Sequence, residues 1–179
     1  MKRKQGFTLV ELLTVVAIVG LIAGIAIPSL LRARISANES ATIGDIRTVI
    51  SAQATYQSAN AGWFDGRPAC LAAPSIGCIP SYPTNAPAFL DSQLASLVVK
   101  SGYTRSFAPG SLASPLDTTR DSPSSVGQYV YGATPSQEGA TGVRGFAGDH
   151  TGVLCATSDG SVPAVLDGKI AVSTCQVLR

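Results

Sequence analysis

The chain has 179 residues, with 13 Lys or Arg, 11 Asp or Glu and a single His, which gives a formal net charge of +2 at pH 7. This length fits one domain beside a membrane segment. The small net charge does not indicate nucleic-acid binding, and the GxGxxG, P-loop and HExxH motifs of common enzyme families are absent. We therefore expect neither an enzyme nor a cofactor-binding protein.

The N-terminal stretch joins a basic start to a long apolar run. Residues 2–4 are Lys-Arg-Lys, and Glu11 is the only ionised side chain in residues 7–31. An apolar run of this length can cross a bilayer as a single helix, and the cations before it favour a cytoplasmic N-terminus. We expect one membrane-spanning helix, with the rest of the chain on the opposite side of the membrane.

The motif GFTLVELL at residues 6–13, followed by the apolar run and Pro28, resembles the N-terminus of type IV pilin and pseudopilin precursors. The resemblance implies that a prepilin peptidase cuts the chain after Gly6 and methylates the new amine of Phe7. It also implies that Glu11 acts with Phe7 in assembly and that Pro28 kinks the helix. The chain would then be a prepilin that polymerises through its N-terminal helix into a type IV pilus-like filament.

The same resemblance implies a location and a set of partners. A prepilin is held by membrane lipid as a single-pass protein of the bacterial inner membrane, with its N-terminus in the cytoplasm. An inner-membrane assembly platform then adds it to a filament, as a homo-oligomer or a copolymer with other pilins. The filament is either a cell-surface pilus or a periplasmic pseudopilus.

Glu11 has a physical reason to need a cationic partner. An unpaired carboxylate inside a bilayer costs about 2.5–3.5 kcal/mol on insertion scales. Cleavage before Phe7 would create a cationic amine, and residues 7 and 11 share one face of a helix. The amine could pair with Glu11 of its own chain or of a neighbouring subunit. A plain signal anchor with Glu11 at the lipid headgroups is the alternative, and it leaves the Gly6-Phe7 sequence unexplained.

Beyond the apolar run, the sequence predicts that the helix continues and becomes amphipathic. Ile35, Ile46 and Tyr56 recur at helical spacing, and the Asn-Ala-Gly sequence at residues 60–62 supplies a stop signal. Glu39 interrupts the apolar stripe near its beginning, so we expect that turn of the helix to be exposed.

The C-terminal half has the pattern of an antiparallel sheet, with short alternating runs at residues 102–110, 126–134, 142–149 and 152–158. We expect a pilin-like α+β fold, in which the amphipathic half of the helical spine covers one face of about four strands. The expected segments are a leader at residues 1–6, a transmembrane and assembly helix at 7–31, its amphipathic continuation at 32–60, an αβ-loop at 61–97, and the sheet with a C-terminal disulfide-bonded loop at 98–179.

The four cysteines, Cys70, Cys78, Cys155 and Cys175, all follow the membrane segment. An even number on the side of the membrane that faces an oxidising compartment indicates disulfides. Three pairings are possible, and we favour Cys70–Cys78 with Cys155–Cys175, which close a short loop and a C-terminal loop. No metal site is expected, because no cysteine pair has CxxC spacing and His150 is the single histidine.

The remaining polar residues form no catalytic constellation. His150 lies in an expected turn, and Asp117 and Asp121, which could help to bind calcium as a loop does in some type II secretion pseudopilins, fit turn positions better. The chain lacks the DPWGNPY-like segment of major pseudopilins, and a C-terminal disulfide loop is more typical of pilins. The resemblance therefore favours a type IV pilin over a type II secretion pseudopilin, and over a membrane-anchored extracytoplasmic binding domain.

Overall fold

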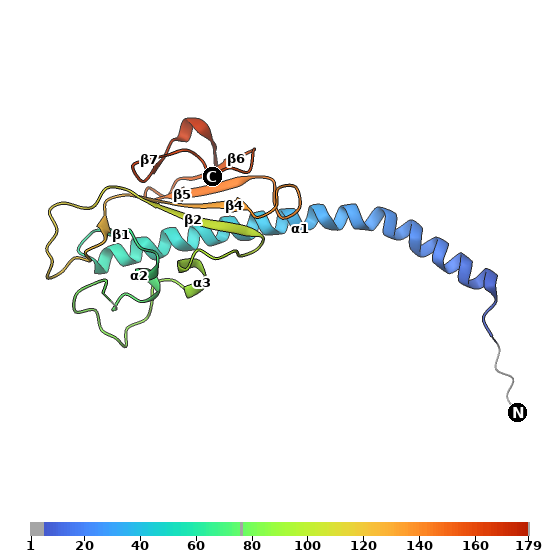
Figure 1. Cartoon of the computed structure of the whole chain (residues 1–179), viewed down its shortest axis with the longest axis horizontal. Coiled ribbons are helices and arrows are strands. Elements are labelled where there is room, and N and C mark those ends of the chain that lie inside the picture. The colour runs from blue at the N-terminus through green and yellow to red at the C-terminus, as the bar shows by residue number, and fades with distance from the viewer. Residues whose placement is uncertain (1–5, 76, 179) are drawn as a thin grey trace, which may run out of the picture. The chain divides into compact units, whose positions relative to one another are not determined.

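The computed structural model describes residues 6–75 and 77–178, so the basic residues 2–4 of the expected leader lie outside the described residues. The chain divides into two compact units, residues 1–34 and residues 35–179. We call the second unit the head. A single helix, α1 (Leu9–Ala59), contributes residues to both units (Figure 1). Pro28 lies within this helix. The helix begins two residues after the expected start at residue 7 and ends next to the Asn-Ala-Gly stop signal.

The head joins the second half of α1 to an antiparallel sheet, which confirms the expected α+β fold. The strands of this sheet are β2 (Tyr103–Pro109), β4 (Tyr129–Pro135), β5 (Gly145–Asp149), β6 (Leu154–Thr157) and β9 (Gln176–Leu178), paired in the order β2-β4-β5-β6-β9. The first four coincide with the runs expected from the sequence. β9 makes the sheet five-stranded, and its three residues are too few to show an alternating pattern.

Short elements lie in the segment between α1 and β2 and in the connections between the strands. These are β1 (Phe64–Asp65), α2 (Ala69–Ala72), α3 (Ser92–Ala95), β3 (Ser125–Val126), β7 (Val165–Leu166), β8 (Lys169–Ile170) and the 3-10 helix η1 (Val172–Thr174). β1 pairs with β3, and β7 pairs with β8 in a hairpin.

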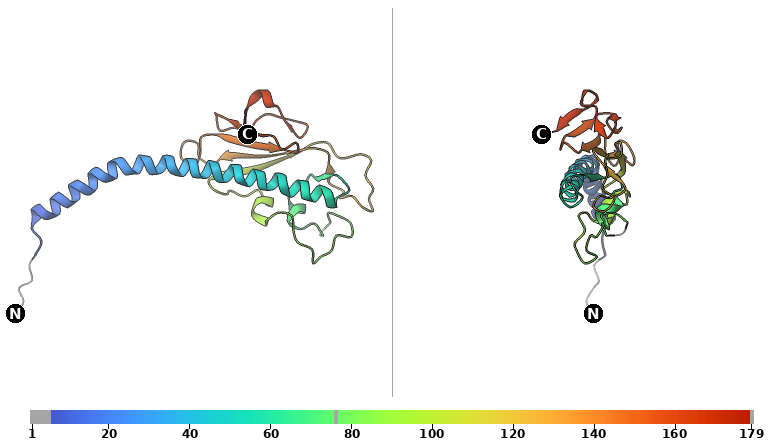
Figure 2. Two further views of the ribbon diagram at one scale, coloured as in Figure 1. Left: turned by 180° about the vertical axis from the view of Figure 1, so that it is seen from behind. Right: turned by 90° about the vertical axis from the view of Figure 1, so that its left-hand side faces the viewer.

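One face of the sheet is covered by α1, as Figures 1 and 2 show. Ile46 and Tyr56 of α1 are fully buried in one apolar cluster with Phe146 of β5, so the predicted apolar stripe does face the sheet. A Cβ added to Gly148 of β5 would lie 2.5 Å from Cγ2 of Ile46 and 2.8 Å from Cδ1 of Ile50. The missing side chain at Gly148 therefore allows the helix to approach the sheet closely.

The opposite face of the sheet is covered by the C-terminal segment that contains β7, β8 and η1, drawn in red in Figures 1 and 2. Val130, Ala147 and Cys155 of the sheet form a second apolar cluster with Ile170 of β8. A disulfide between Cys155 and Cys175 ties this segment to β6. The sheet is therefore buried on both faces, and the second cover could not be predicted because strands of two residues each have no readable pattern.

The loop between α1 and the sheet packs onto the same core as α1. Leu71 of α2 and Leu94 of α3 are almost fully buried in the cluster that contains Ile46. A disulfide joins Cys70 to Cys78 within this loop. These are the two cysteine pairs that the sequence favours, with Cα–Cα distances of 5.6 Å for Cys70–Cys78 and 5.7 Å for Cys155–Cys175.

A buried polar network fixes the C-terminal end of α1. The carboxylate of Asp65 is fully buried and accepts hydrogen bonds from the hydroxyls of Tyr56 (2.6 Å), Ser122 (2.7 Å) and Ser124 (2.6 Å). Gln53 donates to the backbone carbonyl of Asp65 at 3.0 Å. Burial, together with the bond to Asp65, raises the pKa of the Tyr56 hydroxyl, so Tyr56 remains a donor. A buried carboxylate with this many partners holds α1 to β1 and to the segment before β3.

The expectation that Glu39 lies on an exposed turn is wrong. Glu39 is only 7% exposed, and its Oε2 accepts from Nη2 of Arg144 at 2.7 Å and from Nε of Arg144 at 2.9 Å. Burial by itself would raise the pKa of Glu39, but Arg144 and two backbone amides outweigh burial and lower it. The pair could not be predicted from the sequence, because its partners are separated by 105 residues.

We expect Gly148→Ala to destabilise the head by about 1–3 kcal/mol, because the added methyl group overpacks the contact with Ile46. Gly44→Ala is the matched control, since no atom lies within 4 Å of a Cβ at Gly44 on the exposed face of α1. It should stabilise the helix by about 0.5–1 kcal/mol. Denaturant unfolding of the full chain in detergent micelles, followed by the fluorescence of Trp63, measures both effects. An unchanged or raised midpoint for Gly148→Ala would contradict this packing.

Candidate functional site

The first turn of α1 is held by three hydrogen bonds between Thr8 and Glu11, which run in both directions. Oε2 of Glu11 accepts from the backbone N–H of Thr8 at 2.9 Å and from its hydroxyl at 2.7 Å. In return, the N–H of Glu11 donates to Oγ1 of Thr8 at 3.2 Å. This arrangement is a capping box, which satisfies backbone donors that the start of a helix leaves without partners.

The capping box explains why α1 begins at Leu9. In the uncut chain Phe7 precedes the cap and lies outside the helix. The shared helical face of Phe7 and Glu11, expected after cleavage, stays a prediction. The capping role of Thr8 was not predicted. The Thr-x-x-Glu spacing immediately before an apolar run was the signal that could have identified it.

The bond between Gly6 and Phe7 lies in a segment without regular secondary structure, and Phe7 is 82% exposed. Exposed segments of this kind are the sites most open to proteolytic cleavage. The position suits the cleavage that the resemblance implies, with the new amine formed one residue before the capping box.

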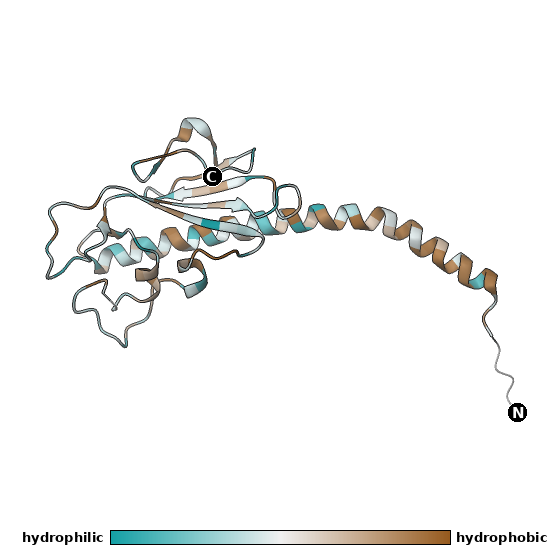
Figure 3. Ribbon diagram, in the orientation of Figure 1, coloured by the Kyte–Doolittle hydropathy of each residue, from teal (hydrophilic) through white to brown (hydrophobic). Residues whose placement is uncertain are grey.

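Residues 9–31 of α1 present an apolar surface. Every large apolar side chain in this stretch is more than half exposed, and Figure 3 shows the stretch mostly in the brown of hydrophobic residues. Among the described residues, α1 is the one helix long and apolar enough to cross a membrane. The hydroxyl of Thr14 donates to the carbonyl of Val10 at 2.7 Å, so this polar group is satisfied within the helix.

Pro28 lies within α1, where it has no amide hydrogen to donate to the carbonyl four residues earlier, at Gly24. A Cβ at Gly20 or Gly24 would meet no atom within 4 Å. These glycines therefore leave one stretch of the helix surface open to close approach. A bend at Pro28 stays a prediction.

The polar residues singled out from the sequence form no metal-binding cluster in the part of the head that the structure describes. No group of three or more His, Cys, Asp or Glu side chains able to hold a metal is present there. His150 packs edge-on against the rings of Phe64 and Tyr129, with ring centroids 6.0 Å and 6.5 Å away. Asp117 and Asp121 take part in a turn, in which Asp121 Oδ2 accepts from the N–H of Asp117 at 2.7 Å.

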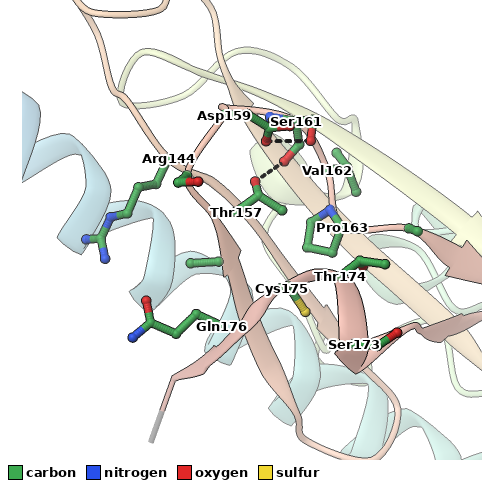
Figure 4. Close-up of a pocket in the computed structure, with 13 residues that line it drawn as sticks. Arg144, Thr157, Asp159, Ser161, Val162, Pro163, Ser173, Thr174, Cys175 and Gln176 are labelled. Atoms are coloured by element: carbon green, nitrogen blue, oxygen red, sulfur yellow. Dashed lines mark hydrogen bonds between the residues drawn. The ribbon is translucent and has the colours of Figure 1, made fainter.

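A groove of about 710 Å³ lies beside the Cys155–Cys175 disulfide (Figure 4). Its polar lining is mostly hydroxyl groups, and two of these donate to neighbouring oxygens of the same turn. Thr157 donates to the carbonyl of Ser161 at 2.5 Å, and Ser161 donates to Oδ1 of Asp159 at 2.7 Å. The described residues that line the groove include no histidine and no free thiol.

Comparison with known proteins identifies the same N-terminal segment as the region with a recognised motif. Residues 1–27 match the family model of the prokaryotic N-terminal methylation motif. The chain is 35% identical over 85 residues to the type IV wide pilus major component PilA4 of Thermus thermophilus, a match that covers 48% of this chain and 62% of that protein. It is 38% identical over 56 residues to the type IV major pilin protein PilA of Myxococcus xanthus, covering 31% of this chain and 26% of that protein.

The chain thus spans less than two thirds of the length of either relative. No solved structure is significantly similar to it. The expected resemblance to type IV pilins is confirmed by the methylation motif together with these relatives.

We expect Thr8→Ala to loosen the first turn of α1, because it removes the hydroxyl that accepts from the Glu11 N–H and donates to the Glu11 carboxylate. Loss of an N-terminal cap costs about 1 kcal/mol, so amide hydrogen exchange at residues 10–12 should speed up about fivefold in micelles. Thr8→Ser should retain the wild-type rate. Thr14→Ala, which removes a hydroxyl from the helix interior, serves as the control. Equal rates in Thr8→Ala and the wild type would show that the capping box does not hold this turn.

Proposed function

We propose that this chain is the precursor of a structural subunit of a type IV pilus, cut after Gly6, methylated at Phe7 and polymerised through α1. The observation that carries the proposal is the combination of the methylation motif at residues 1–27 with an apolar helix surface that is exposed along its whole length. The named relatives are pilus components, which supports a pilus over a secretion pseudopilus. The head, with its own buried core and two disulfides, is the part carried to the outside.

Processing would change the charge at the start of α1. The backbone N of Thr8 lies 2.9 Å from Glu11 Oε2 in the uncut chain. A cationic amine at Phe7, one residue earlier, would therefore form within a few ångströms of an acceptor that is already oriented. Methylation retains the positive charge. The Glu11 carboxylate would then have either its own amine or a neighbour's amine as a counter-ion.

Assembly would transfer α1 from lipid to a bundle of identical helices. Both environments cover the apolar surface of residues 9–31, so the apolar contribution to the free energy changes little between them. Charge pairing distinguishes them, because opposite charges attract more strongly in a water-poor bundle. We infer that Glu11 of the incoming subunit pairs with the amine of a subunit already in place, which fixes the axial position of the new helix.

The proposed function implies a set of partners for the chain and an order of cellular locations. Before assembly, the chain would lie in the bacterial inner membrane with its N-terminus in the cytoplasm, where a prepilin peptidase reaches Gly6. An inner-membrane assembly platform would then move it into a surface pilus made of copies of this chain or of this chain with other pilins. Its segments would be the leader at 1–6, the assembly helix at 7–31, the spine continuation at 32–60, the loop at 61–97 and the sheet with its disulfide-bonded loop at 98–179.

Gly6→Leu should block processing, because a branched side chain would occupy the position before the cut. We expect uncut precursor to accumulate in the membrane and filaments to be absent. Immunoblots of membrane fractions separate the two forms by size, and Gly44→Ala is the control glycine substitution away from the cut. Normal filaments from the Gly6→Leu chain would contradict the proposed processing.

Glu11→Ala and Glu11→Gln should both insert, be cut and fold, yet assemble poorly, because each leaves the neighbouring amine without its anion. Glu11→Gln retains the shape of the side chain, so its failure would identify charge as the cause. The measurement is the amount of sheared filament relative to processed monomer in the membrane. Abundant filaments from Glu11→Ala would refute the pairing, whereas loss of the monomer itself would show that Glu11 serves folding or insertion.

A further inference from the structure

Glu39 is bound by four hydrogen bonds from a single loop. Its Oε2 accepts from Nε and Nη2 of Arg144, at 2.9 Å and 2.7 Å. Its Oε1 accepts from the backbone N–H groups of Val143 and Arg144, at 3.2 Å and 3.1 Å. One residue earlier, the side-chain amide of Asn38 donates to the carbonyl of Thr141 at 2.9 Å. We call these five bonds the lock.

The loop that supplies the lock, residues 136–144 between β4 and β5, is itself fixed. The hydroxyl of Thr141 bonds to the backbone of Gln137. The hydroxyl of Tyr103, in β2, donates to the carbonyl of Arg144 at 2.9 Å. The guanidinium of Arg144 also lies over the ring of Phe146, 5.3 Å from its centroid. The lock therefore joins α1 to a loop that is itself bonded to β2 and lies next to β5.

The lock lies where α1 enters the head. The head begins at residue 35, and among the described residues of the head Asn38 is the first in α1 whose side chain bonds to another element. The apolar contact of Ile46 with the sheet follows two turns later. Apolar contacts are non-directional and tolerate sliding, whereas a two-bond pairing of a guanidinium with a carboxylate has a fixed geometry.

We propose that Glu39 and Arg144 are positioning residues for filament assembly. They fix the position of α1 relative to the sheet at the turns where the helix enters the head. This inference rests on the proposed function. A subunit that is drawn out of lipid and into a filament transmits force between α1 and the head at the point where α1 enters the head. Opening from that end has to break the lock before it reaches Ile46, so the lock resists peeling of the head from its helix.

The first test is amide hydrogen exchange of the full chain in detergent micelles. In Glu39→Ala, amides of residues 38–44 should exchange about tenfold faster than in the wild type, while amides of β5 are unchanged. Glu39→Gln should have a smaller effect, because its amide oxygen still accepts from the two backbone N–H groups. Ser40→Ala is the control on the same turn, since the Ser40 hydroxyl bonds only to the carbonyl of Ser36 in α1. Wild-type exchange in Glu39→Ala would overturn the lock.

The second test separates positioning from general stability. Cells that make Glu39→Ala should contain normal amounts of processed monomer but several-fold fewer filaments. Gly148→Ala weakens the head without touching the lock and should retain the wild-type number of filaments per processed monomer. Equal losses in the two variants, or normal filaments from Glu39→Ala, would overturn the positioning role. Absence of filaments from the wild-type chain would contradict the proposed function, and the exchange result would still report on the lock.

Discussion

Between residues 9 and 31, α1 carries large apolar side chains on every side, and each of them is more than half exposed. Water is an unfavourable environment for such a surface, at roughly 25 cal/mol for each Å² of apolar area. This surface is more stable in contact with lipid or with other copies of the helix than with water. The polar groups of the helix are compatible with either environment. The Thr8–Glu11 capping box begins the helix, and the Thr14 hydroxyl is hydrogen-bonded within the helix. Glu11 is the one ionised side chain in residues 7–31, so its free energy differs most between the two environments.

In the head the surroundings of α1 differ, because one face of the helix packs on a sheet and the other remains exposed. Ile46 and Tyr56 supply the apolar contact, and Gly148 allows the close approach. Polar anchors lie at both ends of this contact, with Glu39 on Arg144 at one end and the Asp65 network at the other. Apolar packing attaches the helix, and the buried ionic and hydrogen-bonded groups specify one setting for it.

Local patterns in the sequence predicted the structural elements that depend on residues close to one another in the chain. The helical stripe that includes Ile46 and the four longer strands have a hydrophobic period that the sequence shows directly, and the apolar run is recognised by its length. Polar pairs between distant residues and very short strands could not be predicted. Glu39 reads as an interruption of the stripe until Arg144 is placed beside it, and β9 and the β7–β8 hairpin are too short to have a period. The capping box was a readable signal, and it moves the start of α1 from residue 7 to Leu9.

We propose that this chain is processed and then polymerises through α1. Mass spectrometry of the N-terminal peptide from filaments sheared off the cells that make it tests this most directly. We expect the assembled chain to begin at Phe7 and to carry a methyl group on its amine. Filaments without this chain, or an assembled chain that still begins at Met1, would contradict it.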